Sequence, residues 1–129
     1  MSTPTQLVGA AVLPHTIDIE EALLASLLED NRRVALVSDT LKAEHFFDPV
    51  NARIYDAIRS MTDSGEVADY LTLSPYLADL FEDGQKQALA HLLDLTQGVV
   101  GGKAGNYARV LVDMATRRDL IAMADDLKA

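Results

Sequence analysis

The sequence predicts an all-α protein, a compact bundle of about five or six helices with a long helix at the C-terminal end. Leu and Ala, which favour helices, account for 37 of the 129 residues, whereas the β-branched Val and Ile account for 15. No clear alternation of apolar and polar residues, the pattern of a strand, is present. The seven Gly and four Pro residues fall at breaks between helical segments or in first turns.

The chain is expected to begin with a flexible leader, residues 1–15, followed by a Leu-rich helix. Thr16 is a candidate N-cap, and Glu20 and Glu21 suit the positively polarised first turn of this helix. We interpret these carboxylates as partners of the helix dipole rather than as an acid–base pair, because adjacent residues of a helix point in different directions. The apolar face of the helix consists of Leu23, Leu24, Leu27 and Leu28.

A second helix is expected over about residues 31–42, and a third helix begins at Asp48–Pro49. Asp is a favoured N-cap, and Pro is well tolerated in the first turn of a helix. The third helix has a regular apolar stripe and is expected to stop at residues 63–65, where a glycine occurs. The residues expected in the core are Leu24, Leu27, Leu28, Phe46, Ile54 and Ile58.

Two shorter helices complete the expected globular body, residues 16–103. Thr72 is a candidate cap for the first of them, which is expected to close at Asp83–Gly84. A Leu-rich helix follows, and it ends before a flexible, glycine-containing break at residues 98–105.

The long helix is expected over residues 104–129. At 1.5 Å per residue it is roughly 36 Å long, more than a body of this size needs, so it is expected to project or to pack against something beyond the body. Arg117 and Arg118 interrupt its apolar stripe. They are either a solvated pair balanced by neighbouring aspartates or a contact for a partner protein or phosphate. The candidate interface residues are Tyr107, Leu111, Met114, Arg117, Arg118 and Ile121.

Composition excludes several classes of protein. The net charge of −9 is located entirely in residues 1–105, so a basic surface for non-specific nucleic-acid binding is not expected there. Cysteine is absent, which excludes disulfides and thiolate metal sites. No apolar run reaches the roughly 18 residues of a membrane span, and the first eleven residues lack the basic start of a signal peptide. These features fit a cytoplasmic protein with no membrane partner.

Two short motifs suggest chemistry. Residues 97–104 resemble a phosphate-binding loop, but Gln97 replaces its first glycine and Ala104 replaces the Ser or Thr that holds Mg²⁺. We therefore expect neither ATP binding nor a catalytic site. Glu44, His45 and Asp48 offer nitrogen and oxygen ligands for a metal, although helix capping and solvent contact are the more common roles of such residues.

The order of several motifs resembles the N-terminal domain of the replicative DNA helicase DnaB. The resemblance begins at Leu13-Pro14-His15-Thr16-Ile17, continues through residues 41–49 (LKAEHFFDP) and 53–58 (RIYDAI), and returns at residues 106–112 (NYARVLV). Arg118 and Leu120-Ile121 complete the last segment. The resemblance covers about residues 13–129.

The resemblance implies a parent that is a hexameric, ATP-driven helicase, with ATP and Mg²⁺ bound in a separate C-terminal motor domain. This chain contains no segment resembling that motor, so it is expected to be neither an enzyme nor a cofactor-binding protein. In the family, the N-terminal domain pairs with itself around a ring and helps to bind a DnaG-type primase. A helicase loader is a further implied partner, and DNA is expected to be contacted only through the parent. A helical hairpin mediates much of this, and residues 104–129 match its first arm.

Two alternatives stay open. One is a freestanding phage- or plasmid-type adaptor that mimics this domain, which the extent of the reading frame would distinguish. The other is a small metal-dependent enzyme using Glu44, His45 and Asp48, which would require bound metal in the pure protein.

Overall fold

A computed structural model describes residues 7–8, 11–12, 17–98 and 103–128, with side chains from residue 17 onward. Most of the predicted leader, the Thr16 cap and residues 99–102 of the predicted break therefore lie outside the described residues. The α-helices are α1 (Ile17–Glu29), α2 (Val34–Val37), α3 (Pro49–Asp63), α4 (Tyr70–Leu73), α5 (Gln85–Thr96) and α6 (Ala104–Lys128). Short 3₁₀ helices cover Asn31–Arg33, Ala43–His45 and Ser74–Leu80.

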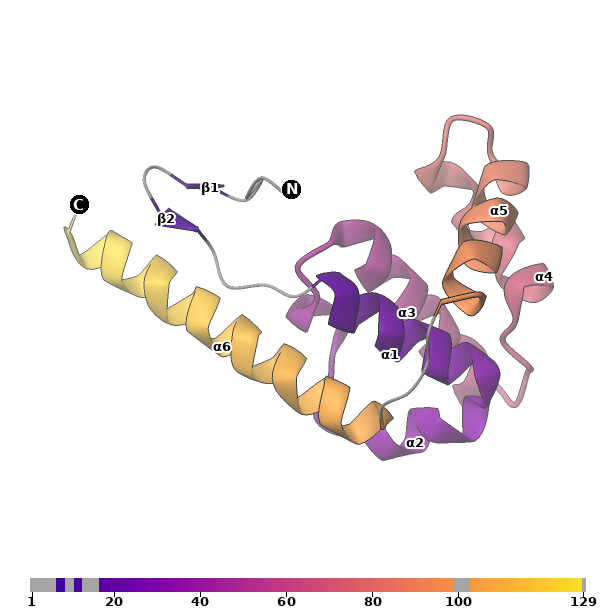
Figure 1. The fold of residues 1–129 in the computed structure, drawn as a ribbon, viewed down its shortest axis with the longest axis horizontal. Coiled ribbons are helices and arrows are strands. Elements are labelled where there is room, and N and C mark those ends of the chain that lie inside the picture. Colours follow the sequence, from indigo (N-terminus) through magenta and orange to yellow (C-terminus); the bar gives the residue numbers. More distant parts are fainter. Residues whose placement is uncertain (1–6, 9–10, 13–16, 99–102, 129) are drawn as a thin grey trace.

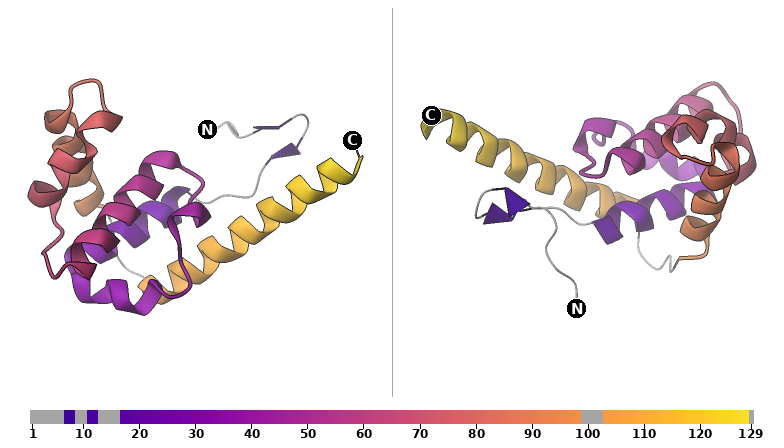
Figure 2. Two further views of the ribbon diagram at one scale, coloured as in Figure 1. Left: turned by 180° about the vertical axis from the view of Figure 1, so that it is seen from behind. Right: turned by 90° about the horizontal axis from the view of Figure 1, so that it is seen from above.

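The all-α prediction is confirmed for the described residues, which form a helical body and one long helix, α6. Figure 1 shows α1 to α5 gathered on one side, while α6 passes along the body and extends well beyond it. The views in Figure 2 agree that the second half of α6 leaves the body. One small feature was not expected: β1 (Leu7–Val8) and β2 (Ala11–Val12) pair antiparallel, with Leu7 opposite Val12.

Two helix boundaries follow from local capping, as expected. The Asp48 carboxylate accepts a hydrogen bond from the backbone N–H of Val50 at 2.8 Å, and Pro49 opens α3. At the other end of α3, Gly65 adopts a positive φ of 76°, a left-handed conformation that glycine tolerates best. The prediction for this helix is confirmed at both ends.

The predicted helix over 31–42 is wrong, because a 3₁₀ turn and the four-residue α2 occupy that stretch. Asp30 caps the turn by accepting from the N–H of Arg32 at 3.1 Å. The Asn31 amide reaches across to residue 68, donating to its carbonyl at 3.0 Å and accepting from its N–H at 2.8 Å. These tertiary hydrogen bonds hold the chain in a tight turn where a regular helix would continue α1.

The predicted cap at Thr72 is also wrong, because Asp69 caps α4 instead. The Asp69 carboxylate accepts from the N–H groups of Leu71 and Thr72, and the Thr72 hydroxyl accepts from the N–H of Asp69 in return. The α-helix then lasts only to Leu73. Pro75 has no N–H for the α-helical bond to residue 71, and the chain continues as a 3₁₀ helix.

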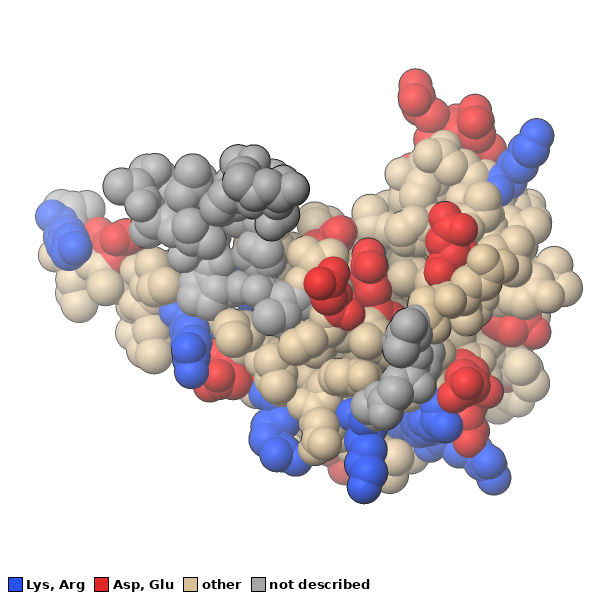
Figure 3. Space-filling view, in the orientation of Figure 1, with Lys and Arg blue, Asp and Glu red and all other residues tan. Residues whose placement is uncertain are grey.

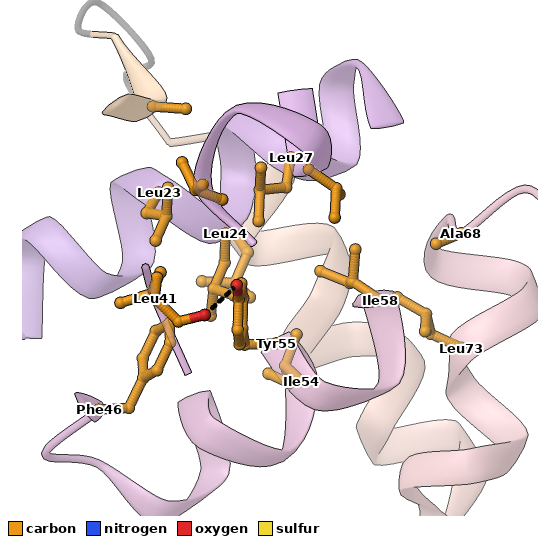
Figure 4. Close-up of a cluster of buried hydrophobic side chains, with 14 of the residues drawn as sticks. Leu23, Leu24, Leu27, Leu41, Phe46, Ile54, Tyr55, Ile58, Ala68 and Leu73 are labelled. Carbon is orange, nitrogen blue, oxygen red and sulfur yellow. Dashed lines mark hydrogen bonds between the residues drawn. The ribbon is translucent and has the colours of Figure 1, made fainter. Parts of the chain in front are cut away.

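The core lies around α1, between α3, α5 and α6. Figure 4 shows α1 leucines facing side chains of α3, with the Tyr55 hydroxyl donating a hydrogen bond of 2.7 Å to the carbonyl of Leu41. Burial raises the pKa of Tyr55 to about 12, so this hydroxyl stays protonated. Of the expected core residues, Leu28 is only partly buried. The others are buried: Leu24, Leu27, Phe46, Ile54 and Ile58.

Candidate interaction surface

Helix α6 contacts the body through a stripe of small residues. Ala104, Ala108, Leu111 and Ala115 are its buried residues, at spacings of four, three and four that place them on one side of a helix. This side packs on α1 and α2. Because alanine side chains are short, the axis of α6 lies close to the body. The stripe that the sequence predicted shares only Leu111 with the observed one.

Arg118 makes the last of these contacts with the body. Its Nη2 atom donates a hydrogen bond of 2.9 Å to the backbone carbonyl of His45, and its guanidinium lies 5.4 Å from the centre of the Phe47 ring. The neighbouring Arg117 is exposed and pairs with Asp113, four residues earlier, at 3.2 Å. The two arginines therefore differ: Arg117 belongs to the solvated face, whereas Arg118 joins α6 to the segment between residues 45 and 47.

Beyond Arg118, large apolar side chains of α6 are exposed. Leu120 is 59% exposed, Met123 61% and Leu127 88%. At 3.6 residues per turn these three share one side of the helix, roughly 130° around the axis from the side that packs on the body. None of these three is among the predicted interface residues, although their spacing of three and four residues is a signal that could have identified them.

The structure places the predicted interface residues in three groups. Tyr107, Met114 and Ile121 are half-buried along one flank of the stripe that packs on the body. Leu111 is 1% exposed and belongs to the core, so it is not available to a partner. Both arginines have the intramolecular contacts described above. The apolar surface open to a partner on α6 thus lies mainly at residues 119–128, further along the helix than the candidates.

Glu20 anchors the segment on which Arg118 packs, and the sequence analysis missed this role. It is 1% exposed, so its interpretation as a simple partner of the helix dipole is wrong. Its carboxylate accepts from the N–H groups of Phe47 at 2.6 Å and Asp48 at 3.3 Å, and from the Asn51 side chain at 3.1 Å. Burial raises the pKa of Glu20, although hydrogen bonds from Asn51, Phe47 and Asp48 oppose that shift.

The candidate metal ligands are engaged in local structure. His45 Nδ1 accepts from the N–H of Lys42 at 2.9 Å, and Asp48 caps α3. Within the described ranges, no group of three or more His, Cys, Asp or Glu side chains is arranged to hold a metal ion.

A hollow of about 360 Å³ between α1 and α5 is lined by Asp18, Glu21, His91 and Asp94 among others.

The charged side chains are unevenly distributed over the face drawn in Figure 3. Lys and Arg gather along its lower edge, over α2 and the start of α6, and Asp and Glu dominate the upper part. Three arginines of the described chain pair with acids close by in the sequence: Arg32 with Asp30, Arg33 with Glu29, and Arg117 with Asp113. This neutralises much of the positive charge.

Membrane insertion finds no support in the helices. Over the described part of the chain, none is both long and apolar enough to cross a bilayer.

Comparison with known proteins identifies relatives of this fold and sequence. Residues 12–113 match the model of the DnaB-like helicase N-terminal domain. The replicative DNA helicase DnaB of Rickettsia felis is 32% identical over 119 residues, which are 90% of this chain and 24% of that protein. DnaB of Treponema pallidum is 29% identical over 125 residues, 96% of this chain and 28% of that protein.

A solved structure shows the same fold. The N-terminal domain of DnaB helicase from Mycobacterium tuberculosis superposes with a TM-score of 0.76 at 25% sequence identity, covering 88% of this chain and 83% of that one. The chain spans about a quarter of the length of the curated helicases it matches, and the matched part is their N-terminal domain, not the motor region. With family model, sequence and fold in agreement over most of its residues, the chain belongs to the DnaB-like helicase N-terminal domain family.

Proposed function

We propose that this chain is the oligomerisation and primase-interaction domain of a replicative DNA helicase of the DnaB type, acting in DNA replication. Unwinding and ATP hydrolysis belong, in this proposal, to a motor outside these 129 residues. The chain itself assembles copies of the helicase and presents a docking surface to a DnaG-type primase, with a helicase loader as a further partner. It touches DNA only through the parent protein.

The exposed apolar stripe Leu120, Met123 and Leu127 carries the proposal for self-association. Burying a Leu or Met side chain is worth about 1.5–3 kcal/mol, so covering the exposed parts of these three gains roughly 4 kcal/mol per copy. A pair of copies gains roughly twice that, from which the loss of rotational and translational freedom must be subtracted. The gain of about 8 kcal/mol would by itself correspond to a dissociation constant of about 1 μM, and the cost of association makes the expected dimer considerably weaker than this.

Sedimentation velocity tests this interface. The wild-type chain is expected to shift from monomer toward dimer as its concentration rises into the range of several hundred micromolar. The double variant Leu120→Asp/Leu127→Asp is expected to remain monomeric. Ala122→Asp is the matched control, since it adds the same charge to an exposed position on the same segment but on another side of the helix. It is expected to dimerise like the wild type.

A wild-type chain that stays monomeric at several hundred micromolar would contradict self-association through α6. If the double variant dimerised as strongly as the control, the side of α6 that carries Leu120, Met123 and Leu127 would not be the interface. Circular dichroism of all three proteins checks that each remains helical, and little change is expected because these positions are exposed.

The primase contact rests on membership of the family and requires its own test. Isothermal titration calorimetry of this chain with the DnaG-type primase of the same genome is expected to give saturable binding. The same titration with single-stranded DNA is expected to give little heat, because the chain carries a net charge of −9. Absence of primase binding by chains that do dimerise would remove this partner and leave the assembly role in place.

A further inference from the structure

The direction in which α6 leaves the body depends on a small contact at residue 118. Upstream of that point, three of the four buried side chains of the helix are alanines, and the fourth is Leu111. Downstream of it, no residue through Lys128 is buried. Among the described residues, Arg118 is the last of α6 whose side chain donates a hydrogen bond to the body, and beyond it only Ile121 is half-buried. Arg118 therefore lies near the junction of the packed and projecting halves.

The segment that Arg118 contacts, residues 45–48, is itself held in place by hydrogen bonds to α1. His45, the last residue of the 3₁₀ helix at 43–45, supplies the carbonyl acceptor, and Phe47, between that helix and α3, supplies the ring. Glu20, on α1, fixes this segment by accepting the N–H groups of Phe47 and Asp48. The result is a continuous chain of contacts from α1, through residues 45–48, to α6.

We propose that Arg118 is a positioning residue that sets the exit direction of the projecting half of α6, and that Glu20 fixes the surface against which it works. Both interactions of the Arg118 guanidinium, with the His45 carbonyl and with the Phe47 ring, serve this role. The hydrogen bond to the His45 carbonyl fixes the guanidinium at one point, and the Phe47 ring restricts its orientation. A lysine at this position would keep the charge but lose the planar group that stacks on the ring.

The geometry explains how the Glu20 side chain is accommodated although it is buried. Two adjacent backbone N–H groups at the start of α3 and one side-chain amide converge on it, and a carboxylate can accept from all three. A glutamine would offer one oxygen and an NH₂ group, which would face donors. The E20Q variant is therefore expected to disturb the segment at residues 46–48 while keeping the shape of the side chain.

The size of the expected effect follows from helix geometry. Residues 119–128 extend about 15 Å beyond Arg118, so a swing of about 20° at that point would move the end of the helix by about 5 Å. Distances between spin labels resolve a change of this size. Cysteine is absent from the sequence, so the two labels can be placed without removing native thiols.

The experiment uses Ser60→Cys on α3 and Ala124→Cys on α6, both exposed positions, with spin labels and electron–electron double resonance. Labelled protein is diluted in an excess of unlabelled protein, so distances between copies do not contribute and the result is independent of dimerisation. The parent is expected to give one narrow distance distribution. Residue 124 lies about 9 Å beyond Arg118, so in R118A the distribution is expected to broaden, or to shift by about 3 Å for the same swing of about 20°.

R117A is the matched control. It removes the same side chain from the adjacent position, where arginine pairs with Asp113 on α6 itself, and its distance distribution is expected to match the parent. R118K is expected to give an intermediate width. E20Q is expected to broaden the distribution in the same way as R118A, although residue 20 is remote in sequence from α6.

An unchanged distribution in R118A would overturn the proposal, and so would equal broadening in R117A. Broadening in R118A but not in E20Q would remove the role of Glu20 and keep that of Arg118. If E20Q fails to fold, Asn51→Ala tests the same anchor, since it removes one of its three donors. This inference also stands apart from the proposed function. If the chain stays monomeric in sedimentation while R118A still changes the distance distribution, self-association is wrong and the role of Arg118 is kept.

Discussion

The two halves of α6 differ in which apolar residues they bury and which they expose. Residues 104–118 pack on the body through Ala104, Ala108, Leu111 and Ala115, whereas residues 119–128 expose Leu120, Met123 and Leu127. Hydrophobicity alone would predict the reverse, with the large side chains covered and the small ones exposed. The difference shows that close approach of the helix axis, rather than bulk, governs its packing on the body. The large side chains of the projecting half are left for another surface.

The largest expected difference between the two halves is the cost of removing a leucine. Leu111→Ala is expected to lower the free energy of unfolding by about 2–5 kcal/mol, because the side chain is fully buried and leaves a cavity. Leu127→Ala is expected to change it by less than about 0.5 kcal/mol. Urea denaturation at low protein concentration measures both. Similar losses in the two variants would show that residues 119–128 are packed against the body.

Enlarging an alanine is expected to change the stability of the protein differently in the two halves of α6. Ala108→Leu forces bulk into the close contact between α6 and the body, and is expected to cost about 1–3 kcal/mol of stability. Ala124→Leu adds the same atoms to an exposed position and is expected to be nearly neutral. Thermal unfolding monitored by circular dichroism compares the two variants. If Ala108→Leu were as stable as the wild type, the small residues would not be required for the close packing.

The smallest expected effect concerns pH and the anchor at the junction of the halves. Burial raises the pKa of Glu20 above that of an ordinary glutamate, so the folded state binds this proton more tightly than the unfolded state does. The contribution of Glu20 to stability is therefore largest when it is protonated. That contribution declines as the pH rises from the unfolded pKa through the raised folded pKa.

Comparing the wild type with E20Q isolates this dependence, because glutamine does not titrate. Denaturation curves from about pH 4 to about pH 7 are expected to show a wild-type stability that falls relative to E20Q as the pH rises. Parallel stability curves would mean that Glu20 titrates alike in the folded and unfolded states.

Local chemistry made several boundaries predictable from the sequence. Asp48 and Pro49 start α3 through a hydrogen bond two residues away, and Gly65 ends it through its backbone conformation. These interactions lie within a few residues, so the linear pattern contains them. The order of motifs likewise indicated the family, which the comparisons then showed. The small core side chains of α6 were harder to predict, because alanine is common on every side of a helix.

What the sequence by itself determined is the all-α class, the helix ends set by local caps, and the membership of the DnaB-like family. Only the tertiary structure decided which side of α6 faces the body, the burial of Glu20, and the different roles of Arg117 and Arg118. The physical reason is separation along the chain. Glu20 meets the groups that donate to it 27 to 31 residues away, and Arg118 meets His45 across 73 residues. Such contacts exist only when folding brings these segments together, and no local pattern specifies them.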